Sequence, residues 1–132
     1  MEELLHVRLQ RHKAMNTTAQ ANQVRISARK IRFISDSIKN KSIDESLQML
    51  QLIHRRGASV LEKLIRSAVA NAVNNGRIDR AVLSIERIDV TEGTPLKRFH
   101  ASTRGRIHPY KKKSSHIRVV LKEKEGGLAS SK

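Results

Sequence analysis

The 132-residue chain contains no cysteine and no tryptophan, and its only aromatic residues are Phe33, Phe99 and Tyr110. Without cysteine the chain cannot form a disulfide framework, a thiolate nucleophile, or a zinc ribbon or knuckle. Three aromatic rings are too few for the stacking platforms of an RRM or an OB-fold. We therefore do not expect sequence-specific reading of splayed single-stranded bases.

A long apolar run is also missing, since no segment approaches the roughly 20 residues that a membrane-spanning helix needs. The start, Met1-Glu2-Glu3, has neither the basic region of a signal peptide nor the acid-poor composition of a transit peptide. The six glycines form no Gly-x-Gly-x-x-Gly or Walker-type loop. We expect a protein that stays in the compartment where it is made, with a cytoplasmic location as the simplest case.

Residue clusters that could carry out catalysis are absent as well. The six histidines show no i,i+4 pairing with one another and no neighbouring carboxylate cluster, so we expect no metal site and no cofactor. Ser114-Ser115-His116 places hydroxyls beside an imidazole, but neighbours on a strand point to opposite faces and no local acid orients the ring. A hydrogen-bonding role for His116, to RNA or to a turn, is favoured. The sequence therefore predicts no catalytic residues and no enzyme.

Positive charge is what the chain has in excess. Lysine and arginine number 27 against 12 aspartates and glutamates, which gives a net charge of +15 and a pI near 11.2. Phosphates repeated along a backbone favour such dispersed cations through counterion release, so nucleic acid is the first partner to consider. An anionic membrane is the rival, but it requires one interfacial helix with a free apolar face, and the helices expected here bury theirs in a core. We expect no membrane partner.

The excess is concentrated between Glu92 and Glu123, a stretch without a single acid. Such a segment repels itself in water and needs a polyanion to lie against. Its ends have strand character, and an extended middle with Gly105 and Pro109 would reach on the order of 40 Å at ~3.3 Å per residue. We predict a long basic β-hairpin. Its cations are Lys97, Arg98, Arg104, Arg106, Lys111, Lys112, Lys113, Arg118 and Lys122.

Apolar periodicity predicts three helices in the first half of the chain. The first is capped by Ser27 and stops at Asn40, and its early cations oppose the helix dipole, which suggests that they serve a partner. The second opens with a capping box of Ser42 and Glu45. The third starts after Gly57. Strands are expected near 16–26, over 81–90 with a bulge at Glu86 and Arg87, and over 117–122.

These elements predict an α+β fold with three helices packed on a small antiparallel sheet and a long extended basic hairpin. The predicted organisation is an N-terminal extension (1–23), a globular domain (24–92 and 116–124), an extended arm (93–115) and a disordered tail (125–132). A helix-turn-helix is disfavoured because its recognition helix would present Asp44 and Glu45 to DNA. Backbone and shape recognition of a folded RNA remains.

Several blocks of the sequence closely resemble the bacterial-type form of the large-subunit ribosomal protein twenty-two family. They are Val24-Arg25-Ile26-Ser27-Ala28-Arg29-Lys30, Leu64-Ile65-Arg66-Ser67-Ala68-Val69-Ala70-Asn71-Ala72, Glu92-Gly93-Thr94-Pro95-Leu96-Lys97-Arg98, Gly105-Arg106 and Lys113-Ser114-Ser115-His116-Ile117. The blocks stand in the family's order at fitting spacings, and the match runs from about Val24 to Lys122.

This resemblance implies a structural protein that rests on large-subunit rRNA near the outer end of the peptide exit tunnel, supports assembly, and lines the tunnel with its hairpin. Neighbouring ribosomal proteins and the nascent peptide would be further partners, and bacterial or organellar ribosomes both fit. The candidate rRNA-binding residues are Arg25, Arg29, Lys30, Arg32, Lys97, Arg98, Arg104, Arg106, Lys111, Lys112, Lys113, Ser115 and His116. The tip expected to face the tunnel comprises His100, Ala101, Ser102, Thr103, Arg104, Gly105, Arg106, Ile107 and His108.

The chain departs from the family pattern at three places. The family usually has proline where Ala28 stands, often arginine at Ser102, and often Arg-Ile-Lys-Lys in place of Pro109-Tyr110-Lys111-Lys112. The alternative from a different class is a stand-alone nucleic-acid-binding regulator. A nuclease ranks behind both because the sequence offers no metal or acid–base set.

Overall fold

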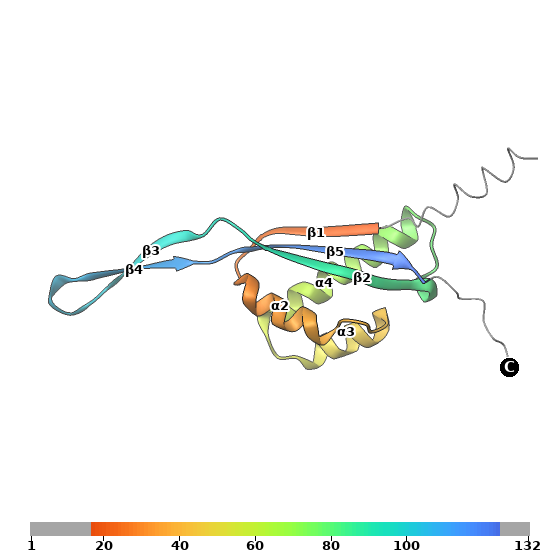
Figure 1. Cartoon of the computed structure of the whole chain (residues 1–132), viewed down its shortest axis with the longest axis horizontal. Coiled ribbons are helices and arrows are strands. Elements are labelled where there is room, and N and C mark those ends of the chain that lie inside the picture. Colours follow the sequence, from red (N-terminus) through yellow and green to blue (C-terminus); the bar gives the residue numbers. More distant parts are fainter. Residues whose placement is uncertain (1–16, 125–132) are drawn as a thin grey trace, which may run out of the picture.

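The computed structural model describes residues 17–124 and shows helices packed on a sheet, with a hairpin projecting from one end (Figure 1). The elements are β1 (Thr17–Val24), α2 (Ala28–Ser37), α3 (Ile43–Leu52), α4 (Arg56–Asn74), a 3-10 turn (Arg80–Val82), β2 (Leu83–Glu92), β3 (Leu96–Ala101), a second 3-10 turn (Thr103–Gly105), β4 (Ile107–Lys112) and β5 (Ser115–Glu123). The predicted α+β fold class is confirmed. Most of the predicted extension and the predicted tail lie outside the described residues.

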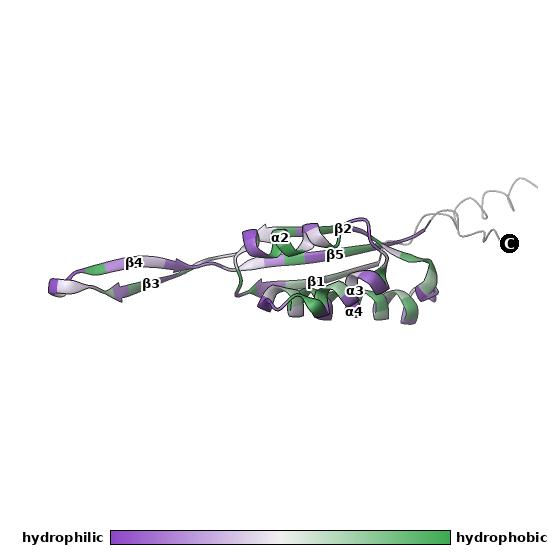
Figure 2. Cartoon of the chain, turned by 90° about the horizontal axis from the view of Figure 1, so that it is seen from below, coloured by the Kyte–Doolittle hydropathy of each residue, from purple (hydrophilic) through white to green (hydrophobic). Residues whose placement is uncertain are grey.

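The body of the protein is a three-stranded antiparallel sheet in the order β1-β5-β2, with the three helices on one face (Figure 2). β1 pairs with β5 from Thr17 onward, so the sheet includes residues that the sequence assigned to the extension. The register of β2 against β5 shifts between Ile85 and Arg87, which confirms the predicted bulge. A bulge increases the local twist of a strand, and this one lies at the sheet edge covered by α2 and α3.

The hydrophobic core lies between the sheet and the three helices. Ile117, Val119 and Leu121 on the central strand are fully buried, as the alternation along β5 predicts. On α4, Ala68 and Ala72 have no exposed surface where the helix packs against β1. Their small side chains let the helix axis approach the sheet closely, so this end of α4 uses close contact of backbones in place of large side chains.

Two predicted helix boundaries are wrong. α4 begins at Arg56, so Gly57 lies inside the helix and does not precede it. α2 crosses at this point, and a Cβ at Gly57 would lie 2.8 Å from Cδ1 of Ile34, so a larger residue would require this side chain to move. α2 ends at Ser37, before the predicted stop at Asn40, because the Ile38 N–H turns back to the Ser35 carbonyl. The capping box of α3 is confirmed.

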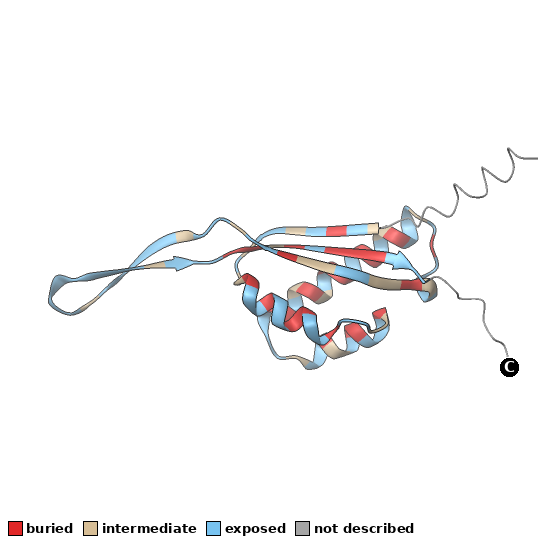
Figure 3. Ribbon diagram, viewed as in Figure 1, coloured by how far each residue is buried: buried red, intermediate tan, exposed pale blue. Residues whose placement is uncertain are grey.

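The hairpin extends away from the body as a two-stranded ribbon. β3 and β4 pair antiparallel from Leu96 opposite Lys112 to Ala101 opposite Ile107. Arg104 takes a left-handed φ of 59° at the tip. No residue from 94 to 113 is buried, so the ribbon has no apolar core of its own (Figure 3). Its two strands contact chiefly each other.

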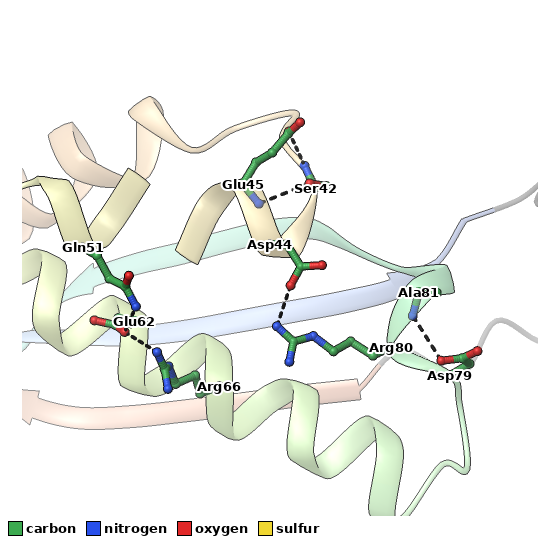
Figure 4. Close-up of polar contacts among 9 residues, drawn as sticks. All are labelled: Ser42, Asp44, Glu45, Gln51, Glu62, Arg66, Asp79, Arg80 and Ala81. Atoms are coloured by element: carbon green, nitrogen blue, oxygen red, sulfur yellow. Dashed lines mark hydrogen bonds and ion pairs between the residues drawn. The ribbon is translucent and has the colours of Figure 1, made fainter. Parts of the chain in front are cut away.

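Several acidic side chains of the body have partners within the body (Figure 4). Asp44 lies 2.5 Å from Arg80, and Glu62 accepts hydrogen bonds from Gln51 at 3.1 Å and Arg66 at 2.7 Å. The hydrogen bond from Gln51, followed by the nearby positive charge of Arg66, lowers the pKa of the half-buried Glu62 carboxyl. The helices that the structure describes include none long and apolar enough to cross a membrane. The body thus partly balances its own charge, and the hairpin does not.

Candidate nucleic-acid interface

A cleft of about 830 Å³ opens where the base of the hairpin meets the starts of two helices. Residues that precede and begin α2 and α4 contribute to its lining, and so do three lysines at the end of β4 and just after it. Seven of its eleven residues are lysine or arginine, and none is acidic. The lining consists of Arg25, Ile26, Ser27, Lys30, Ile34, Arg55, Arg56, Gly57, Lys111, Lys112 and Lys113.

The two helix starts add further positive potential to this basic cleft. Neither helix has an acidic residue in its first turn, and neither N-cap side chain makes a capping hydrogen bond. Within the described residues, the first N–H groups of α2 (Ala28 and Arg29) and of α4 (Arg56 and Gly57) donate to no carbonyl. Free N–H groups and the helix dipole together favour anions at such positions. Seven cations beside two uncapped helix starts form an arrangement suited to phosphate groups.

A second groove, of about 700 Å³, differs from the cleft in its charge. It lies between α2 and the strands β2 and β5, and it mixes Arg32, Lys39 and Arg118 with Asp36 and Asp89. Lys39 pairs with Asp36 at 2.5 Å. Because both signs are present and partly paired, this groove offers a polyanion much less than the basic cleft does.

The structure brings together candidate residues that lie far apart in the sequence. Arg25 and Lys30 line the same cleft as Lys111, Lys112 and Lys113. The remaining candidate cations on the hairpin are exposed along the ribbon: Lys97, Arg98, Arg104 and Arg106. Arg29 is exposed on α2 but does not line the cleft. None of these side chains makes an ion pair within residues 17–124, so all remain free to neutralise phosphates.

Three other candidates serve the fold. The Arg32 guanidinium donates to the Val90 carbonyl, with Nη2 at 2.8 Å, and so ties α2 to β2. Ser115 has no exposed surface, so its hydroxyl does not lie where it could meet a phosphate, which disfavours the predicted contact with rRNA. The serine is buried because it pairs with both β1 and β2 on the central strand. His116 accepts a hydrogen bond at Nδ1 from the Gln23 N–H at 3.1 Å.

Sequence reasoning missed Arg55 and Arg56, which lie at the start of α4 inside the basic cleft. The Arg55 guanidinium lies 5.4 Å from the centre of the exposed Phe33 ring, a cation–π contact that holds it at the cleft. A signal was present, because two adjacent arginines stand at the start of a helix whose first turn has no acid. The same pattern in Arg29 and Lys30 was used as an indication of a partner.

A polar cluster at residues 23, 93, 94, 114 and 116 fixes the direction in which the hairpin leaves the body. The Ser114 hydroxyl donates to the Thr94 carbonyl at 2.7 Å and lies 3.0 Å from Oε1 of Gln23. The Gly93 N–H donates to the Ser114 carbonyl at 2.9 Å. A Cβ at Gly93 would lie 2.7 Å from the Ser114 hydroxyl, so the absence of a side chain at residue 93 lets these two segments approach each other this closely. The cluster holds Lys113 and its neighbours in place beside Arg25.

In the absence of RNA, we expect limited trypsin digestion to cut first between Lys97 and Lys113. This ribbon exposes its lysines and arginines and buries no side chain, so it opens locally at a low free-energy cost. Cleavage sites would be mapped by mass spectrometry over a short time course. Lys63 and Arg66, on the well-packed α4, serve as internal controls, and earlier cleavage there would contradict the expectation. Added rRNA should delay the cuts in the ribbon.

Comparison with known proteins identifies the family. The family model described as ribosomal protein L22p/L17e matches residues 19–122, which is most of the described chain. The chain belongs to this family. The predicted resemblance is therefore confirmed, and membership makes the chain a structural protein of the large ribosomal subunit and not an enzyme.

Relatives from several bacteria are similar to the chain over nearly their whole length. Each is named large ribosomal subunit protein uL22. The protein of Pediococcus pentosaceus is 46% identical over 109 residues, covering 83% of this chain and 92% of the relative. That of Caldicellulosiruptor saccharolyticus is 42% identical over 120 residues, covering 86% and 98%. That of Mycoplasma mobile is 40% identical over 110 residues, covering 83% and 100%.

Proposed function

We propose that the protein binds large-subunit rRNA through the basic cleft and the hairpin, which act as one continuous surface. The observation that carries this proposal is the position of Lys111, Lys112 and Lys113. They lie at the end of β4, the strand that returns from the tip, and just after it, and they also line the cleft beside Arg25 and the start of α4. An RNA backbone following the hairpin toward the body would therefore meet cations without interruption.

The base and the tip of the hairpin have different roles in this proposal. The base, with the basic cleft, anchors the protein in rRNA and supports assembly of the subunit. The tip, His100 to His108, lies at the end of the ribbon farthest from the body and lines the peptide exit tunnel, where it faces the nascent peptide (Figure 1). Neighbouring large-subunit proteins contact the remaining surface of the body.

The test is a competition between each variant and the intact protein for incorporation into large subunits. In the base variant, Lys111, Lys112 and Lys113 are changed to alanine, and we expect weaker incorporation because each lost phosphate contact reduces affinity for any RNA sequence. In the tip variant, residues 102–106 are replaced by Asn-Gly, a two-residue turn that suits the pairing of Ala101 with Ile107. We expect it to incorporate as well as the intact protein and to alter passage of peptides through the tunnel.

The amount of each form in purified subunits would be measured by quantitative mass spectrometry. Equal incorporation of the base variant would contradict the anchoring role of the base. Exclusion of the tip variant would contradict the division between base and tip, since the tip would then be needed for assembly.

A further inference from the structure

The pairing of β3 with β4 divides the side chains of the hairpin between two different faces. Residues directly opposite each other point the same way, and the direction alternates along each strand. One face carries Arg98, His100, His108 and Tyr110, and we call it the ring face. The other face carries Phe99 opposite Pro109 and Ala101 opposite Ile107, and we call it the apolar face.

On the ring face, His100 stacks on Tyr110. The two ring centroids are 4.0 Å apart and the planes differ by 14°, which is a nearly parallel stack between diagonal neighbours of the ribbon. Tyr110 is half-buried whereas His100 is exposed. The pair therefore presents a supported ring to the surroundings. Because each ring limits the rotation of the other, a third ring could add to the stack with little further loss of side-chain entropy.

We infer that this stack is a docking site for one unpaired nucleobase of the rRNA, which adds to it against the exposed imidazole of His100. His100 is the first residue of the tip, so the inference places it at the boundary where the rRNA ends and the tunnel-facing part of the tip begins. The inference rests on the proposed function, since the hairpin must already lie in RNA. It assigns the two ring residues a role that the charge of the hairpin does not provide. Neither residue was chosen from the sequence for stacking, because an isolated histidine and an isolated tyrosine ten positions apart show no pattern.

The surroundings of the stack favour a nucleobase over an apolar peptide. Arg98 lies directly opposite Tyr110 on the same face, and no acidic residue occurs anywhere in the hairpin. A polycationic track that holds a phosphate backbone, combined with rings on which a base can stack, is the general design of proteins that bind single-stranded nucleic acid. Stacking accepts any base because every base has a π-face. A single such contact adds affinity and position without reading sequence.

The first test compares binding of full-length variants to protein-free large-subunit rRNA. His100→Asn removes the ring, Tyr110→Leu removes its support, and His100→Phe keeps a planar ring. We expect the first two to lower affinity by roughly 10- to 100-fold at fixed salt, as loss of one stacked base implies. The slope of affinity against salt should not change, since no phosphate contact is lost. His100→Phe should restore most of the affinity, and Phe99→Leu on the apolar face should have almost no effect.

The second test observes the ring itself by NMR. Addition of a short oligoadenylate should move the His100 ring-proton signals upfield, because they would lie over an aromatic base. Polyphosphate, which offers charge without bases, should not produce this shift. The His100→Asn spectrum assigns the signals among the six histidines.

Each outcome bears on the inference. Undiminished binding by His100→Asn, an equal loss in Phe99→Leu, or the same NMR shift with polyphosphate would overturn the docking site while leaving rRNA binding intact. Failure of the intact protein to bind the rRNA at low salt would overturn the proposed function and the docking site together. Loss of affinity in His100→Asn and Tyr110→Leu, with rescue by His100→Phe, would support the docking site.

Discussion

The affinity of the protein for large-subunit rRNA should fall ~10³-fold or more when monovalent salt is raised from about 50 to 200 mM. The reason is counterion release. With roughly six phosphates neutralised, the slope of log affinity against log salt is about −5, and a fourfold rise in salt then lowers affinity by about three decades. Seven cations in the basic cleft, with Lys97 and Arg98 at the base of the ribbon, make at least six such contacts available, and none of them forms an ion pair within residues 17–124.

The measurement is a titration of labelled rRNA fragment at several salt concentrations, with the slope as the readout. Sucrose at matched osmolality serves as the control, because it changes water activity without competing for phosphates. A loss of affinity smaller than about tenfold over the same range would contradict electrostatic recognition and would require a different kind of contact.

Neutralising the start of α4 and its neighbour across the basic cleft should have the second large effect. In the variant Arg25→Gln, Arg55→Gln and Arg56→Gln, three of the seven cleft cations are lost. The salt slope should become less steep by about 2 to 3, which corresponds to a loss of affinity on the order of 10²- to 10³-fold near 0.1 M salt. The body should remain folded, because Arg55 and Arg56 oppose the dipole of α4, and their removal should leave the free energy of unfolding unchanged or slightly higher.

A matched control removes the same amount of charge elsewhere. Arg66, Arg80 and Arg87 are each paired with an acid of the body, at 2.7, 2.5 and 3.2 Å. Their change to glutamine should reduce rRNA affinity only slightly. Equal losses in the two triple variants would show that net charge matters and the basic cleft does not. Thermal unfolding of both variants separates loss of binding from loss of folding.

Much of the candidate interface was predictable because its signals are local. The acid-free stretch from 93 to 122 and the early cations of the first helix are visible in composition and position alone. The pairing of Ser115 with strands on both sides was not predictable, since burial of a serine depends on which neighbours the sheet supplies. Arg55 and Arg56 carried a local signal, two arginines at the start of a helix without an early acid, but only the packing of the hairpin base beside them shows that they belong to the interface.

The sequence by itself determined the class of the protein. The charge excess, the missing cysteines and phosphate loops, and the apolar periods of three helices are properties of local composition, and they required neither distances nor contacts. The tertiary structure decided which charges act together. Arg25, Arg55 and Lys111 share one cleft because β1 and β5 pair antiparallel and α2 crosses α4 at Gly57. Likewise His100 meets Tyr110 only through the register of β3 and β4. Proximity between distant segments follows from packing of the whole chain, which no single stretch of sequence specifies.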